Sequence, residues 1–163
     1  MKILPSLNYI PESRRTLACA GEGCFELAGD GWKDGPSFVH GRYSQTSAVT
    51  SRGLLIVGGG AKNGPYDTEL IPAMGGDGVE SFSLPYWTKF HCMIQVSESE
   101  IVLAGTYHAP NLVTKYSGID GDNVVSEELP PLVTGRYRHA CGTYWADKTQ
   151  VGFHTRLIPL LRC

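Results

Sequence analysis

The sequence lacks any long hydrophobic run and any block of like charges. Its longest aliphatic stretch, Leu54–Val57, is followed at once by the glycines Gly58–Gly60, whereas a membrane-spanning helix needs roughly 20 apolar residues. The 14 basic and 16 acidic residues give a formal net charge of -2, and they do not gather into the runs that bind phosphate backbones or anionic lipids. The composition excludes a transmembrane helix, and we expect neither a nucleic acid nor a membrane as partner.

A secretory signal and a dense cysteine framework are also missing. Residues Met1–Asn8 contain no apolar stretch of about seven residues, which a signal peptide requires. The compartment therefore stays unknown, with the cytoplasm as the default and an extracellular location if the N-terminus is truncated. The five cysteines are Cys19, Cys24, Cys92, Cys141 and Cys163. Cys19 and Cys24 flank a turn and their disulfide state stays open, while the other three stand alone and predict no zinc site.

Helical periodicity is absent too, and the sequence is rich in turn chemistry instead. Twenty glycines and ten prolines stand between short apolar runs that carry Val, Ile, Thr, Tyr and Phe. This pattern is typical of short strands joined by tight turns. The sequence therefore predicts an all-β protein.

A repeat of roughly 47 residues, within the range of known repeat architectures, organises the chain. Gly41–Gln45 recurs as Gly135–His139, with Trp87–His91 as a degenerate copy between them, at steps of 46 and 48 residues. Gly58–Gly59 ends one apolar strand, and Ala104–Gly105 ends another 46 residues later. Such a period indicates units that bury their apolar faces only against one another.

Four strands are predicted within the clearest unit, joined by turns of Gly, Pro, Asn and Asp. Their predicted bounds are Tyr43–Thr50, Leu54–Val57, Thr68–Ile71 and Val79–Leu84. Four antiparallel strands per repeat correspond to one blade of a β-propeller.

The fixed positions of this repeat resemble the kelch family of β-propellers. The kelch pattern runs from an arginine and an aromatic residue, through a diglycine after the second strand, to a tryptophan before the next blade. The residues that carry the match are Arg42, Gly58, Gly59, Gly105, Arg136, His139 and Trp32. The second unit departs from the pattern at Ala104, in place of the first glycine, and at Thr88, in place of the arginine.

The resemblance implies an incomplete, open kelch-like β-propeller of about three four-stranded blades, because a closed ring takes roughly four to eight. We expect an irregular N-terminal segment (1–23), the propeller blades (24–151) and a divergent C-terminal tail (152–163). An open arc leaves apolar blade faces uncovered. This predicts either self-association through those faces or a chain that is a fragment of a longer propeller protein.

The resemblance also places partner contacts on two long loops, residues 60–67 and 107–111, since kelch-like propellers bind through loops on one rim. Aromatic side chains anchor protein interfaces, so we expect Tyr66, Tyr107, His108 and Asn111 to contact a protein partner. Trp32 and Trp87 recur beside Gly-Pro and Leu-Pro turns and are expected to pack between blades.

No cofactor, metal site or catalytic residue is predicted. Gly58–Gly60 does not lead into a helix as a phosphate-binding loop does. His91 and His139 share one repeat position but lack further converging ligands, so we expect structural hydrogen bonds. No nucleophile elbow or catalytic triad is recognisable. The main hypothesis is a kelch-like binding module, not an enzyme. The alternatives are an incomplete gene product without independent function and a copper enzyme similar to galactose oxidase.

Overall fold

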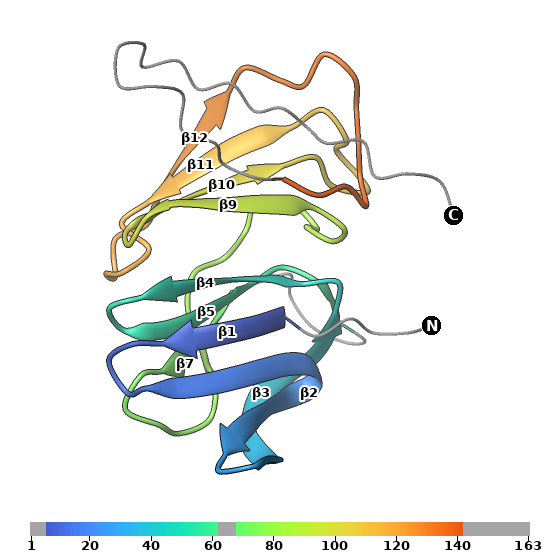
Figure 1. The fold of residues 1–163 in the computed structure, drawn as a ribbon. Coiled ribbons are helices and arrows are strands. Elements are labelled where there is room, and N and C mark those ends of the chain that lie inside the picture. Colours follow the sequence, from blue (N-terminus) through green and yellow to red (C-terminus); the bar gives the residue numbers. More distant parts are fainter. Residues whose placement is uncertain (1–5, 62–67, 142–163) are drawn as a thin grey trace, which may run out of the picture.

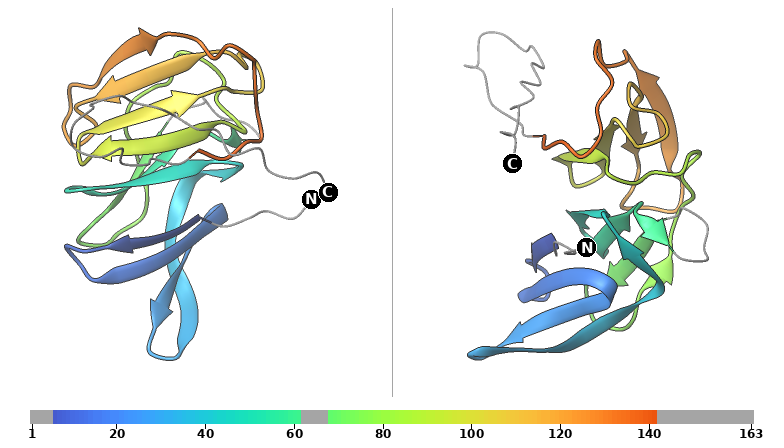
Figure 2. Two further views of the ribbon diagram at one scale, coloured as in Figure 1. Left: turned by 45° about the horizontal axis from the view of Figure 1, so that its top comes forward. Right: turned by 90° about the vertical axis from the view of Figure 1, so that its right-hand side faces the viewer.

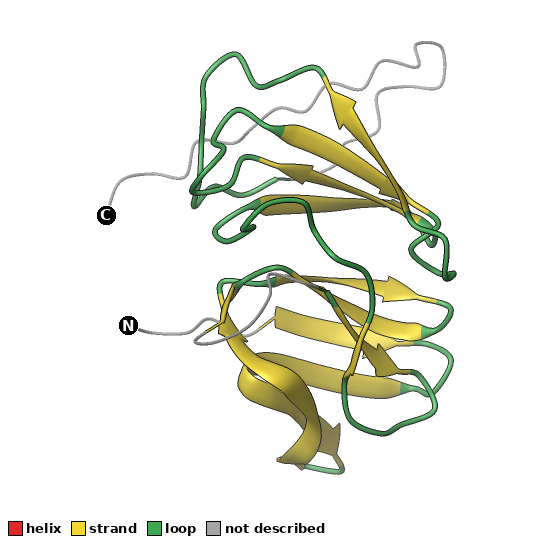
Figure 3. Ribbon diagram, turned by 180° about the vertical axis from the view of Figure 1, so that it is seen from behind, coloured by secondary structure: helices red, strands yellow, loops and turns green. Residues whose placement is uncertain are grey.

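The computed structural model describes residues 6–61 and 68–141, and these form strands and loops without a helix (Figure 3). The strands are β1 (Ser6–Ile10), β2 (Arg15–Ala28), β3 (Gly31–Tyr43), β4 (Thr46–Thr50), β5 (Gly53–Val57), β6 (Gly60–Ala61), β7 (Glu69–Pro72), β8 (Val79–Glu80), β9 (Cys92–Ser97), β10 (Glu100–Ala104), β11 (Val113–Ser117) and β12 (Val125–Leu129). The predicted all-β class is confirmed. Nothing in these two ranges is a helix long and apolar enough to cross a membrane.

The strands form three antiparallel sheets of four strands each (Figure 1). The first sheet has the order β1-β2-β3-β6, the middle sheet β4-β5-β7-β8 and the third sheet β12-β11-β10-β9. Figures 1 and 2 show the third sheet stacked over the middle one, with the β1–β2–β3 strands on the other side. The first strands of neighbouring sheets contact one another, β1 with β4 and β4 with β9.

The middle sheet is buried on both faces, and β5 shows this most clearly. Leu54, Leu55, Ile56 and Val57 are all fully buried, and successive side chains of a strand point to opposite faces. Leu54 and Ile56 belong to one apolar cluster, whose other members are Ile10, Leu17, Cys19, Cys24, Phe38, Ile71 and Ala73. Leu55 and Val57 belong to a second, with Ala48, Leu84, Ile101, Leu103, Tyr116 and Ile119.

The four strands predicted for the clearest unit form this middle sheet, with changed ends. The predicted strand Leu54–Val57 is confirmed within β5, and the last strand is shorter than predicted and stops at Glu80. The predicted start at Tyr43 is wrong, because Ser44 has a φ of 59° and this left-handed backbone interrupts a pleated strand. Tyr43 therefore ends β3, where it pairs with Gly60 of β6.

The N-terminal segment 1–23, expected to be irregular, contains β1 and most of β2. The predicted boundary at Cys24 falls inside β2, which pairs with β1 on one side and β3 on the other. Leu17 and Cys19 face the first apolar cluster, but alanines and glycines occupy the neighbouring positions. The alternation was therefore too weak to show in the sequence.

The repeat appears in the backbone conformation itself. Ser44, Phe90 and Arg138 have φ angles of 59°, 55° and 56°, and they stand 46 and 48 residues apart. Such conformations are rare outside glycine, so their recurrence marks equivalent turns. Gly58 and Gly105, with φ of 61° and 58°, end β5 and β10 in the same way. Gly105 is thus the structural counterpart of Gly58, and the interpretation of Ala104 as the residue in place of the first glycine is wrong.

The pKa of Tyr116, which packs in the apolar cluster between the middle and third sheets, provides a test of this interface. Burial, with a smaller contribution from Tyr86, raises the pKa of Tyr116 to about 12. An unfolded tyrosine ionises near pH 10, so the folded state loses stability as the pH rises from about 10 to about 12. We predict that Tyr116→Phe loses less stability than wild type between about pH 9 and about pH 11, measured by urea unfolding. Parallel losses in the two proteins would show that this hydroxyl is not buried in the folded state.

Candidate functional site

The loops before β9, after β10 and after β12 bring aromatic and cationic side chains together at one rim of the third sheet. We call the set the aromatic rim cluster; its members are Trp87, Lys89, Phe90, Tyr107, His108, Tyr137 and Arg138. The Trp87 ring stacks on His108, with centroids 4.7 Å apart and planes 20° apart. The Lys89 ammonium lies 3.9 Å from the centre of the Trp87 ring and 5.0 Å from that of Tyr107.

Tyr107 stands at the centre of this cluster. Its ring meets His108 and Tyr137 edge to face, at centroid distances of 5.0 and 5.3 Å. The centroid of the Phe90 ring lies 6.4 Å from that of Tyr107. The Arg138 guanidinium lies over the Phe90 ring, 4.3 Å from its centroid. Tyr107 and Tyr137 are 48% and 47% exposed. The cluster is therefore continuous and open to solvent.

The loop after β10 is held in place by its own hydrogen bonds. The buried Thr106 hydroxyl accepts bonds from the backbone amides of His108 and Ala109, at 3.2 and 3.4 Å. The Tyr107 amide donates to the Lys89 carbonyl, at 3.2 Å, and the Gly105 amide to the Leu112 carbonyl, at 2.8 Å. These bonds fix the backbone positions of Tyr107 and His108.

The four predicted contact residues have different outcomes. Tyr107 and His108 lie side by side in the cluster. Asn111 is exposed, but its side chain donates to the Leu132 carbonyl at 3.2 Å, and this bond fixes a loop. Tyr66 lies outside the described residues.

Sequence reasoning missed five members of the cluster. Trp87 was expected to pack between blades, yet its half-buried ring stacks on a loop histidine. Lys89 and Phe90 share repeat positions with Tyr137 and Arg138, and this periodicity was the signal available. The repeat landmarks predict packing positions, and a single sequence does not show that the side chains beside them form one surface.

Arg42 of the repeat signature is buried, 3% exposed, and joins the first sheet to the middle one. Its guanidinium pairs with Glu69 on β7, which is fully buried, and donates to the Gly58 carbonyl at 2.9 Å. The Glu69 carboxylate also accepts the backbone amides of Val39 and His40, at 2.8 and 3.2 Å. The charge pair is thus embedded in further hydrogen bonds, which a buried ion pair needs to be stable.

We predict that Arg42→Leu lowers the free energy of unfolding by about 3–5 kcal/mol, because it leaves a buried carboxylate without its partner. Urea unfolding measures the loss. The matched control is Arg52→Leu, which removes an exposed pair with Asp122 at 2.9 Å and should cost far less. Equal losses in the two variants would contradict a structural role for the Arg42–Glu69 pair.

The glycines of the signature sit where backbones meet. A side chain at Gly58 would overlap the Thr88 carbonyl, and one at Gly105 would overlap the Arg136 carbonyl. Gly59 donates to the same Thr88 carbonyl at 2.7 Å. These contacts join each unit to the next.

Trp32 does not pack between sheets as expected. It is 51% exposed and pairs with Leu27 near the end of the β2–β3 hairpin, which projects beyond the sheets in Figure 1. The two strands are long enough to carry their tip past the apolar clusters, so the interpretation of Trp32 as a core residue is wrong.

His91 and His139 occupy equivalent places but differ in their partners. His91 is buried, and its Nε2 lies 2.7 Å from the Thr46 hydroxyl. Burial, with a smaller contribution from His139, lowers the pKa of His91 to about 4, so its ring is neutral at neutral pH. Burial and then the charge of Arg136 lower the pKa of His139. Both buried ring nitrogens of His139 lack a hydrogen-bond partner among the described residues.

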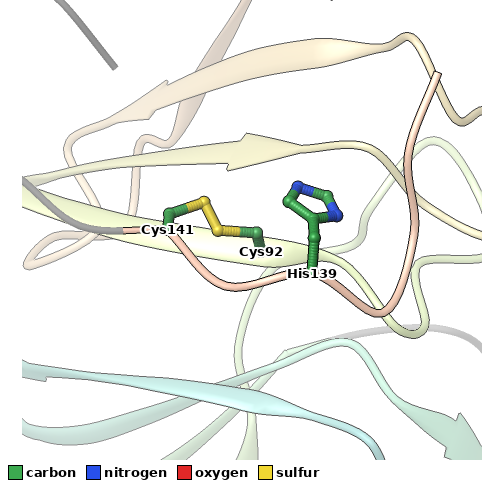
Figure 4. A group of neighbouring side chains, drawn as sticks. All are labelled: Cys92, His139 and Cys141. Carbon is green, nitrogen blue, oxygen red and sulfur yellow. A yellow bond between two sulfur atoms is a disulfide. The ribbon is translucent and has the colours of Figure 1, made fainter. Parts of the chain in front are cut away.

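Four of the cysteines form two pairs. Cys19 and Cys24, whose disulfide state the sequence leaves open, are bonded to each other within β2. Cys92 and Cys141 are also bonded, with Cα atoms 5.7 Å apart (Figure 4). The expectation that these two stand alone is wrong, because their separation of 49 residues is close to one repeat and places them on neighbouring segments.

No known protein family matches the sequence, and no curated protein is similar to it.

Proposed function

We propose that the chain is a kelch-like interaction module with the architecture of an open propeller, which binds a protein partner through the aromatic rim cluster. The observation that carries the proposal is the exposed, continuous set of rings around Tyr107. Aromatic residues and arginine are the residues most enriched among the energetic anchors of protein interfaces. Binding, not catalysis, is the function that such a surface supports.

Three features of the fold support the propeller architecture. The middle and third sheets are two complete four-stranded units. In each sheet the strands lie side by side in chain order, β4-β5-β7-β8 and β9-β10-β11-β12. Their first strands, β4 and β9, contact one another, as the innermost strands of neighbouring propeller blades do. Equivalent left-handed turns precede both units.

The cluster also suggests the chemistry of the partner. Its two charged members, Lys89 and Arg138, are cationic, and each is already placed over an aromatic ring. A partner segment that offers carboxylates beside an aromatic or aliphatic side chain would match both properties. The preformed loop after β10 reduces the entropy lost when the partner binds.

We predict that Tyr107→Ala/His108→Ala weakens binding at least tenfold, because about 1.4 kcal/mol of lost contact corresponds to a factor of ten. The probe is a set of displayed peptides selected on the wild-type chain. We expect these peptides to be rich in Asp, Glu and aromatic residues, and Lys89→Ala to weaken them as well.

The matched control is Tyr9→Ala, which removes a tyrosine of similar exposure, 53%, from β1 of the first sheet. It should leave the affinity of the selected peptides unchanged. An affinity within twofold of wild type for the Tyr107/His108 variant, with its fold intact by circular dichroism, would exclude the cluster as the binding surface.

A further inference from the structure

Cys92, His139 and Cys141 form a group of metal-ligating side chains that the binding surface does not use. Cys92 begins β9, and the other two lie on the segment after β12, one repeat later. The ligand atoms of the three residues all lie within 4.8 Å of one another. Figure 4 shows the two sulfur atoms beside the His139 ring.

The equivalent positions of the preceding unit hold different side chains. One unit earlier, the equivalent positions hold Thr46, His91 and Met93. There the Thr46 hydroxyl lies 2.7 Å from His91 Nε2 and 3.4 Å from the Met93 sulfur. The same scaffold position therefore holds a hydroxyl, an imidazole and a thioether in one unit and two thiols with an imidazole in the next.

His139 has no counterpart of the hydrogen bond between Thr46 and His91. Both of its ring nitrogens are buried and unpartnered among the described residues, an arrangement that is costly for a polar group. The backbone of Gly105 lies directly beside the ring: a side chain at this position would collide with it, because its Cβ would lie 2.9 Å from Cε1 of His139. The packing fixes the ring close to the two sulfur atoms.

We propose that, when the Cys92–Cys141 disulfide is reduced, these two cysteines and His139 bind a zinc ion. Two thiolates and one imidazole are a ligand set that zinc uses in proteins, with a fourth position open to water. In the disulfide form neither sulfur carries the negative charge that a metal ligand needs. The oxidation state of this pair therefore decides whether a covalent bond or a metal ion joins β9 to the segment after β12.

The change of state balances with a thiol reductant such as glutathione. The sulfur–sulfur bond breaks, two reductant thiols are oxidised to their own disulfide, and each cysteine sulfur receives one proton. Binding of the divalent ion then releases both protons and leaves two thiolates on the metal.

Cobalt titration of the reduced, full-length chain tests the site, because Co²⁺ replaces Zn²⁺ and its thiolate ligands give an intense near-ultraviolet absorption band. We expect one Co²⁺ per chain after reduction, displaced by Zn²⁺, and none in the oxidised chain. Cys141→Ser and His139→Gln each remove a proposed ligand and should weaken the binding by at least the roughly 10–100-fold that loss of an outer-shell partner costs.

The other cysteine pair supplies the control. Cys19→Ser/Cys24→Ser should keep the band, since no histidine of the described ranges joins that pair in a group of metal-ligating atoms. His139→Cys should also keep it, with a stronger thiolate signal, and this separates loss of a ligand from loss of the fold. No uptake of micromolar Co²⁺ by the reduced chain, or an uptake that survives Cys141→Ser but not the Cys19/Cys24 change, would overturn the proposal.

Discussion

The fold depends on the burial of both faces of the middle sheet. Each of the four aliphatic residues from Leu54 to Val57 is fully buried, and burying one such side chain stabilises the protein by about 1.5–3 kcal/mol. This stabilisation requires an apolar sheet on either side of β5. The sheets before and after the middle one are therefore part of its core. Loss of one neighbouring sheet would expose two of these four residues, and the middle sheet alone would expose all four.

The same stacking explains why chemistry recurs with the repeat. Adjacent units meet through equivalent turns at Ser44, Phe90 and Arg138, so side chains about one period apart become neighbours. Both the aromatic rim cluster and the Cys92–His139–Cys141 group contain side chains that this stacking of units brings together. A position that supports a hydroxyl and a histidine in one unit supports thiols and a histidine in the next, because the backbone is the same and only the side chains differ.

Sequence reasoning predicted the all-β class, the approximate positions of the four strands of the middle sheet and the strand that ends at Ala104 in the third sheet, since glycines and short apolar runs mark them directly. It missed β1 and the part of β2 before Cys24, where Leu17 and Cys19 alternate with small residues that give little hydrophobic contrast. The prediction for Trp32 was wrong because this residue lies near the tip of a long hairpin, and no local sequence pattern reveals how long the two strands are. The Cys92–Cys141 pair was overlooked because its partners meet only through the stacking of units, although the period itself contained that information.

Native-state hydrogen exchange tests the double burial of the middle sheet most directly. The backbone amides of Leu54–Val57 should exchange only through global unfolding, with a free energy of opening equal to that obtained from urea denaturation. Exchange of these amides through a smaller local opening, while strands of the first or third sheet remain protected, would contradict the account.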